Sequence, residues 1–233
     1  ISLAANEGVS ILPAGTDPNS NPVPEPTGTV EFIGKDTTTK GSWKNVYGTQ
    51  GYVIVGAGES IPSYATVSYI NATDKIWSSS TTDERALQKP GAANDRIAAQ
   101  KYAKLHEIID VNITDGTTRN ISLYLLDWDN QGRWTVVDVI DAKTRKLLNS
   151  QNVYNFSNGV YLKYKVSGNV QFRITNIWTK RYKNSSDTGF SGLFFDGNGQ
   201  VIKPTFSPAG GSYDTEQVVI ISCATSGATI RYT

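Results

Sequence analysis

The chain has 233 residues, enough for one or two domains, and its 38% hydrophobic and 18% charged residues are typical of a globular protein. Its 22 Lys and Arg nearly balance 21 Asp and Glu, giving a formal net charge of +1. This balance argues against a nucleic-acid partner, which would call for a basic surface. No stretch approaches the ~20 apolar residues of a membrane helix, so we expect no membrane partner.

Residues 1–28 are expected to hold the end of a preceding domain and a linker. The stretch TDPNSNPVPEPTGT has four Pro in fourteen residues, which is typical of a semi-rigid extended linker. An ordered loop packed on the next domain is the alternative.

The chain begins with Ile and shows no signal peptide, so we expect any targeting segment to lie outside it. The lone Cys223 cannot form a disulfide within the chain and reads as a small buried hydrophobe.

Residues 29–200 form one β-rich block. Six runs have strand length and are bounded by Gly, Asn, Asp or Ser: VSYI, IIDVNI, ISLYLLDWD, VVDVID, YLKYKV and VQFRIT. Alternation in IIDVNI places Ile109, Val111 and Ile113 inside the fold. The more continuously apolar ISLYLLD predicts a central strand. In DRIAAQKYAKLHE we expect at most a short turn, because no clear apolar stripe is present. The pattern predicts an all-β fold, an antiparallel β-sandwich of the jelly-roll type.

From Lys203 the pattern changes. The segment 203–233 offers a Pro-Gly turn and two short strands, and two or three strands do not close a core of their own. We therefore expect the first part of a truncated domain there.

Six stretches occur in a fixed order across residues 30–196: KDTTTKGSWKNVYGTQGYVI, PSYATVSY, TTDERALQKPG, DRIAA, LYLLDWDNQGRW and GFSGLFFDG. Together they resemble a β-sandwich module appended to secreted bacterial glycanases and polysaccharide lyases. The resemblance implies a non-catalytic carbohydrate-binding module that targets a covalently linked catalytic domain to a polysaccharide. It further implies an extracellular location and allows an acidic polysaccharide such as xanthan as the partner.

A second stretch, PTFSPAGGSYDTEQVVIISCATSGATIRYT, is similar to the opening of the chitobiase C-terminal-like domain. That domain is a small immunoglobulin-like spacer in secreted glycanases. The similarity supports the same extracellular setting by association only.

Sugar binding requires exposed aromatic faces for stacking and polar groups for the hydroxyl rim. Trp43 and Tyr47 lie in GSWKNVYGTQGY, a predicted loop, and loops run over the surface. Both are therefore candidate sugar-binding residues. The alternative is that Trp43, or Tyr52 at the end of the same segment, plugs the open end of the sandwich.

In LYLLDWDNQGRW, a strand is predicted to end in a hairpin turn and the next strand to begin at Arg133. Asp127 and Asp129 would share one face, with Trp128 on the other. Trp128, Asp129 and Arg133 are candidate sugar contacts. The Asp side chains have two alternatives: capping the turn, or holding a structural calcium, although the acidic ligands that complete a calcium loop are absent. No cofactor is required.

Trp134 is a further candidate. Alternation along WTVVDVID places it on one face with Asp138, which predicts that this face is the wetter one.

Arg85 and Arg96 each lie beside acidic residues and are interpreted as structural arginines that tie loops together.

The segment 176–190 departs most from the family pattern, because relatives have a short turn there. It contains four candidate residues, Trp178, Lys180, Arg181 and Tyr182. Interleaved rings and cations suit an anionic glycan. A solvated turn with incidental charges is the alternative.

An enzyme is the less favoured class. His106, the single His, has no obvious partner, and the Asp127–Asp129 spacing is shared by any acid pair two apart on a strand. No Ser-His-Asp order, zinc spacing or nucleotide-binding motif is present. The alternative to glycan binding is a structural spacer or protein-interaction module, which leaves the five Trp unexplained.

Overall fold

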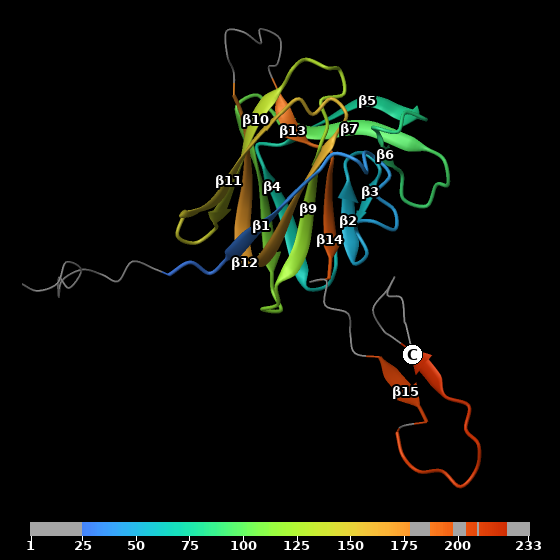
Figure 1. Cartoon of the computed structure of the whole chain (residues 1–233). Coiled ribbons are helices and arrows are strands. Elements are labelled where there is room, and N and C mark those ends of the chain that lie inside the picture. Colours follow the sequence, from blue (N-terminus) through green and yellow to red (C-terminus); the bar gives the residue numbers. More distant parts are fainter. Residues whose placement is uncertain (1–24, 178–186, 198–203, 209, 223–233) are drawn as a thin grey trace, which may run out of the picture.

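The computed structural model describes residues 25–177, 187–197, 204–208 and 210–222. Within these ranges the chain forms strands and turns, and no helix is present that could cross a membrane. The strand pairs are antiparallel and build two facing sheets (Figure 1). The prediction of an all-β antiparallel sandwich is therefore confirmed.

The first sheet runs in the order β1 (Thr29–Asp36), β12 (Val160–Asn176), β9 (Arg119–Leu125), β14 (Gly192–Asp196), β2 (Gly51–Ile54) and β3 (Gly58–Ser60). The second sheet runs in the order β11 (Leu147–Tyr154), β10 (Trp134–Asp141), β12, β8 (His106–Ile113) and β4 (Ala65–Ile70). The long strand β12 belongs to both sheets and joins them.

The change of sheet occurs at Gly168. Residues 160–167 of β12 pair with β1 and β9, whereas residues 168–176 pair with β8 and β10. Gly168 has a φ of 67°, which favours glycine, and a Cβ placed there would lie 2.0 Å from the carbonyl oxygen of Thr27. The bend of β12 therefore needs both the left-handed backbone and the missing side chain.

We predict that Gly168→Ala destabilises the fold more than Gly116→Ala does. Gly116 has a similar φ of 68°, but a Cβ there would meet nothing within 4 Å. Both variants carry the backbone strain, and only the first adds the collision with Thr27, so we expect a difference of about 1 kcal/mol or more. Urea unfolding of the two variants measures it. Equal losses would mean that the chain around Thr27 moves aside freely.

The core follows the alternation expected from the sequence. In β8, Ile109, Val111 and Ile113 are buried, as predicted. Strand β9 lies between β12 and β14, and residues 121–126 are buried consecutively, which confirms it as a central strand. Its burial is continuous because the loop of residues 37–50 covers the outer face of the first sheet, while the second sheet covers the inner face.

A third, smaller sheet contains β13 (Thr188–Phe190), β7 (Arg96–Ala103), β5 (Thr73–Thr81) and β6 (Leu87–Gln88). The stretch DRIAAQKYAKLHE was expected to hold at most a short turn, but it forms the eight-residue strand β7 and the start of β8, with a bend at Lys104 and Leu105 between them. Strands β15 (Thr205–Ser207) and β16 (Ile220–Ser222) pair in a sheet of their own. That residues 203–233 belong to a separate truncated domain stays a prediction, as does the linker, most of which lies outside the described residues.

Candidate functional site

The outer face of the second sheet carries an exposed aromatic pair, Trp134 on β10 and Tyr154 on β11. The two residues are direct cross-strand partners, with ring centroids 6.5 Å apart and ring planes at 74°. Tyr154 is 63% exposed, and Trp134 is half-buried. The Trp134 indole N–H donates to Oδ1 of Asn152 at 3.3 Å, which orients the ring. An aromatic surface of this kind offers a sugar ring a place to stack.

Polar side chains continue along the same face. Asp138 accepts hydrogen bonds from Ser150 at 2.6 Å and from the Arg173 guanidinium at 2.7 Å. One strand further, Gln171 donates to Asp110 at 2.7 Å. The opposite, inward side of β10 is apolar at Val137 and Val139, both fully buried. The prediction that the Trp134 side of this strand is the wetter one is confirmed.

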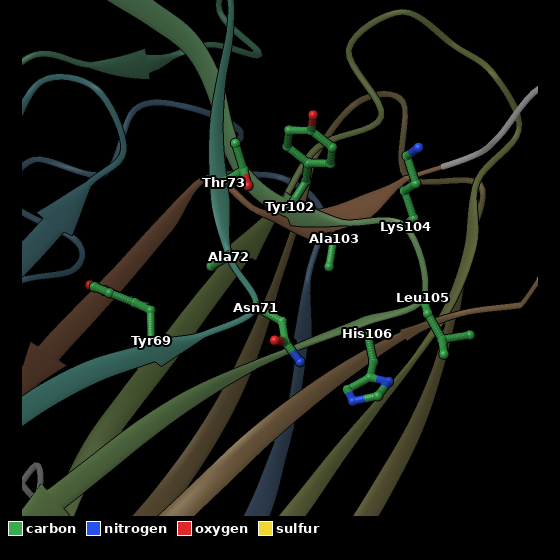
Figure 2. Close-up of a pocket in the computed structure, with 9 residues that line it drawn as sticks. All are labelled: Tyr69, Asn71, Ala72, Thr73, Tyr102, Ala103, Lys104, Leu105 and His106. Carbon is green, nitrogen blue, oxygen red and sulfur yellow. The ribbon is translucent and has the colours of Figure 1, made fainter.

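A surface hollow of about 580 Å³ lies at the same end of this face. It is formed where the turn from β4 to β5 faces the turn from β7 to β8, and Figure 2 shows Asn71, Tyr102 and His106 among its lining residues. His106 pairs with Thr175, which pairs with Val136. The hollow therefore begins about 10 Å from β10, two strand spacings across the sheet.

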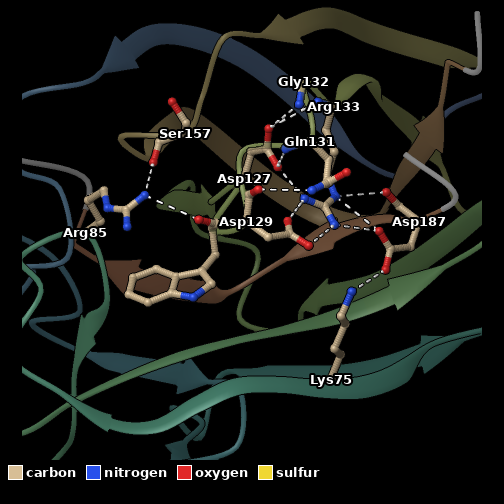
Figure 3. Close-up of polar contacts among 10 residues, drawn as sticks. Lys75, Arg85, Asp127, Asp129, Gln131, Gly132, Arg133, Ser157 and Asp187 are labelled. Carbon is tan, nitrogen blue, oxygen red and sulfur yellow. Dashed lines mark hydrogen bonds and ion pairs between the residues drawn. The ribbon is translucent and has the colours of Figure 1, made fainter. Parts of the chain in front are cut away.

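Arg133, a predicted sugar contact, lies instead in a buried ionic cluster (Figure 3). Its guanidinium forms ion pairs with Asp127, Asp129 and Asp187, the last at 2.8 Å, and Lys75 pairs with Asp187 at 2.9 Å. Only 3% of Arg133 is exposed, so its expected role as an exposed contact is wrong. Burial opposes ionisation of Asp187, but hydrogen bonds from Lys75 and Arg133 hold the pKa of that carboxyl below its usual value.

The turn before Arg133 is a crossover and not the predicted hairpin. β9 and β10 lie in different sheets and do not pair with each other. Asp127 caps the turn, because its carboxylate accepts the backbone N–H groups of Gln131, Gly132 and Arg133 at 3.1, 2.9 and 3.2 Å. The Arg133 guanidinium forms an ion pair with the same Asp127 carboxylate. In the described ranges, no group of three or more His, Cys, Asp and Glu could hold a metal.

Trp128 contacts Arg85, whereas Asp127 and Asp129 both pair with Arg133, so Trp128 lies apart from the two carboxylates, as predicted. The Arg85 guanidinium lies 4.5 Å from the centroid of the Trp128 ring and donates to the carbonyl of Ser157 at 3.1 Å. Arg96 in turn donates to the Ala86 carbonyl at 3.0 Å. Both arginines tie loops together, as interpreted. The Arg85 guanidinium also covers part of the Trp128 ring, which is then not accessible to a sugar.

Trp43 and Tyr47 are not exposed loop aromatics. They are 5% and 8% exposed and pack on the outer face of the first sheet, where Tyr47 stacks on Tyr161 with centroids 4.2 Å apart. The Tyr47 hydroxyl donates to Asp36 at 2.7 Å, and the Trp43 indole donates to the Gln88 carbonyl at 2.8 Å. The expectation that they are exposed is wrong, because the outer face of the first sheet carries aromatic side chains and the two loop residues pack against them.

The candidates Trp178, Lys180, Arg181 and Tyr182 lie outside the described residues, so their role stays a prediction. The residues that border this segment are placed, however. The backbone N–H of Ile177 donates to the Trp134 carbonyl at 2.9 Å, and Asp187 is bound by Arg133. Both borders therefore meet consecutive residues, Arg133 just before β10 and Trp134 at its start, next to the aromatic pair.

Sequence reasoning missed Tyr154. Its signal is the alternation in LLNSQNVY, which puts Tyr154 on the same side as Asn152 and Ser150 and opposite the buried Val153. An aromatic residue that shares one face of an edge strand with polar residues is expected to be exposed. What the sequence did not reveal is the pairing of this strand with β10, which brings Tyr154 beside Trp134.

Comparisons with known proteins find only distant structural similarity. No family model matches the sequence, and no curated protein matches it. One similar solved structure is that of carbohydrate-binding modules from the β-sandwich superfamily, at 10% identity and a TM-score of 0.24. That match covers 57% of this chain and 55% of the other, so the chain spans about half the length of that structure. A likeness of this strength carries no argument about function.

Proposed function

We propose that this chain is a non-catalytic carbohydrate-binding module that uses the outer face of the second sheet. The observation that carries the proposal is the exposed Trp134–Tyr154 pair beside a row of hydrogen-bonding side chains. Stacking on an exposed aromatic ring is worth ~1–3 kcal/mol by analogy with nucleobases, and the polar groups would bind the hydroxyl rim.

The proposed ligand is an acidic polysaccharide such as xanthan. Arg173 lies on the same face with 42% of its side chain exposed, and the neighbouring segment 176–190 is rich in Lys and Arg. Because exposed ion pairs contribute only ~0–1 kcal/mol each, stacking would supply most of the affinity and the cations the preference for acidic chains. The sequence resemblance supports a secreted module tethered to a catalytic domain.

The surroundings of the carboxylates support a non-catalytic role. A glycosidase needs two carboxyl groups that both reach the scissile bond. Asp127 is 2% exposed, and both it and Asp129 are ion-paired with Arg133. A sugar therefore has no access to Asp127, and the two carboxylates do not form a glycosidase pair.

Replacing Trp134 with Ala is expected to weaken binding to xanthan roughly 5- to 100-fold, which corresponds to the loss of one stacking contact. Affinity electrophoresis in gels containing xanthan or hydroxyethylcellulose measures the change. The matched control is Phe206→Ala, which removes another exposed ring (54% exposed) from the β15–β16 sheet. The control should migrate like the unmodified chain.

Two results would contradict the proposal. One is unretarded migration of the unmodified chain in every gel, which would favour the spacer or protein-interaction alternative. The other is equal retardation of the Trp134→Ala variant and the unmodified chain, which would move the glycan away from this face.

A further inference from the structure

A second surface hollow, of about 620 Å³, lies over the outer face of the first sheet. Its walls come from the loop of residues 37–50, from Tyr52 on β2, and from Pro90 and Gly91. A volume of this size is in the range that holds small organic ligands. Since the two sheets face each other with their inner sides, this hollow and the Trp134–Tyr154 pair lie on opposite sides of the sandwich.

Tyr52 gives this hollow a fixed aromatic wall. Strand β2 is hydrogen-bonded on both sides, so Tyr52 is held in register with Phe194 of β14 and Ser60 of β3. The Trp43 ring packs against the Tyr52 ring with centroids 4.9 Å apart, and Trp43 is itself anchored to Gln88. Tyr52 nevertheless stays half-buried and not fully covered. A ring held this way loses little freedom when a sugar stacks on it.

The rim of the hollow is polar, and Lys44 is the one charged residue among its described lining residues. The Lys44 ammonium donates to the Ala92 carbonyl at 2.6 Å, and Thr49 is bound through its N–H and hydroxyl to Asp196. Asn45 is also part of the rim. On the opposite wall, a Cβ placed at Gly91 would meet nothing within 4 Å, so the space beside it is open. An aromatic wall with amide and hydroxyl groups suits an uncharged sugar.

We infer that this hollow is a second glycan site, which takes a neutral hexose unit stacked on Tyr52. The inference rests on the proposed function, because it assigns a second site to the same kind of ligand. Two sites on opposite sides cannot both bind one short stretch of a chain. The module therefore joins two glycan segments and cross-links long polysaccharides, which raises the apparent affinity for them by avidity.

The test uses cellohexaose as the neutral probe and compares the unmodified chain with Tyr52→Ala, Trp134→Ala and the double variant. Titration calorimetry should give two sites for the unmodified chain, one for each single variant and none for the double variant. Tyr52→Phe keeps the ring and is the matched control, with a change of less than about threefold expected. Light scattering with hydroxyethylcellulose should show aggregates only where both sites are intact.

An NMR titration guards against a folding defect in Tyr52→Ala. In the unmodified chain, cellohexaose should shift the backbone amides of Thr49, Tyr52 and Gly91 as a group separate from those of Trp134 and Tyr154. Shifts at the second group alone, or a single site by calorimetry lost in Trp134→Ala, overturn the second site and leave the proposed function standing. Shifts at the first group alone overturn the proposed face and leave the hollow as the binding site.

Discussion

Replacing Arg133 with Met is expected to lower the free energy of unfolding by about 3–5 kcal/mol, the cost of leaving buried charges without their partner. Arg133 is the cation shared by Asp127, Asp129 and Asp187, and both Asp127 and Asp187 are buried. Of the three carboxylates, Asp187 is the one that also forms an ion pair with Lys75 in the part of the chain that the structure describes. Without the guanidinium, the buried Asp127 carboxylate loses the cation with which it is paired. Chemical unfolding followed by fluorescence and circular dichroism measures the loss.

The matched control for this variant is Lys165→Met, which removes a cation from an exposed ion pair. Lys165 and Glu31 lie 3.0 Å apart with 41% and 65% of their side chains exposed. Such a pair contributes ~0–1 kcal/mol, so the control should unfold nearly like the unmodified chain. A loss of less than about 1 kcal/mol in Arg133→Met would show that the three carboxylates do not depend on the buried guanidinium.

The strands were predictable because burial in a sandwich repeats every two residues. In β8 and β10 this period alone places Ile109, Val111, Val137 and Val139 in the core. The continuous burial of β9 was read correctly as a central strand, although its cause is a loop that covers the outer face. Local pattern thus predicts which side of a strand is covered, but not what covers it.

The exposure of the aromatic residues was not predictable, because it depends on partners far away in the chain. Trp43 and Tyr47 lie in a loop, yet they are buried against Phe194 and Tyr161, more than a hundred residues further on. Trp134 begins a strand and remains accessible, because its neighbour on the outer face is another exposed ring. Position in a loop is therefore a poor guide to exposure in this chain.

The ionic cluster shows the same limit for charged residues. Asp127, Asp129 and Arg133 are close in sequence, and their turn was recognised. Asp187, 54 residues after Arg133, is the fourth residue of the cluster and accepts hydrogen bonds from the Arg133 guanidinium. This contact helps to enclose the guanidinium. Because the sequence does not show that contact, Arg133 was interpreted as a surface residue that could bind sugar hydroxyls.

A second buried acidic residue, Glu107 on β8, is expected to make the fold sensitive to pH. Its side chain faces the core beside Phe190 and is fully buried. Burial raises the pKa of this carboxyl well above its usual value, and the nearby Phe190 N–H and Lys101 offset this only in part. Neither carboxylate oxygen has a hydrogen bond of good geometry. The neutral, protonated form is therefore the form that the folded chain prefers.

We predict that Glu107→Gln stabilises the fold at pH 8 by about 1–3 kcal/mol and has little effect at pH 4. A raised pKa means that the folded chain keeps a proton that the unfolded chain has released. The contribution of this group to the free energy of unfolding is therefore largest at pH values below the ordinary pKa of a Glu carboxyl. The contribution is lost as the pH rises through the folded-state pKa. Gln resembles the protonated acid and does not titrate, so the difference between the two proteins should grow with pH.

Urea unfolding of both proteins at several pH values from 4 to 8 measures this difference, and the contributions of the other titrating groups cancel in it. Glu59→Gln, which changes an exposed Glu on β3, is the matched control and should give a difference that stays near zero. A Glu107→Gln variant that is less stable than the unmodified chain at pH 8 would contradict the prediction. It would mean that the ionised carboxylate is stabilised in the fold, through Lys101 or the Phe190 N–H, more strongly than its burial disfavours it.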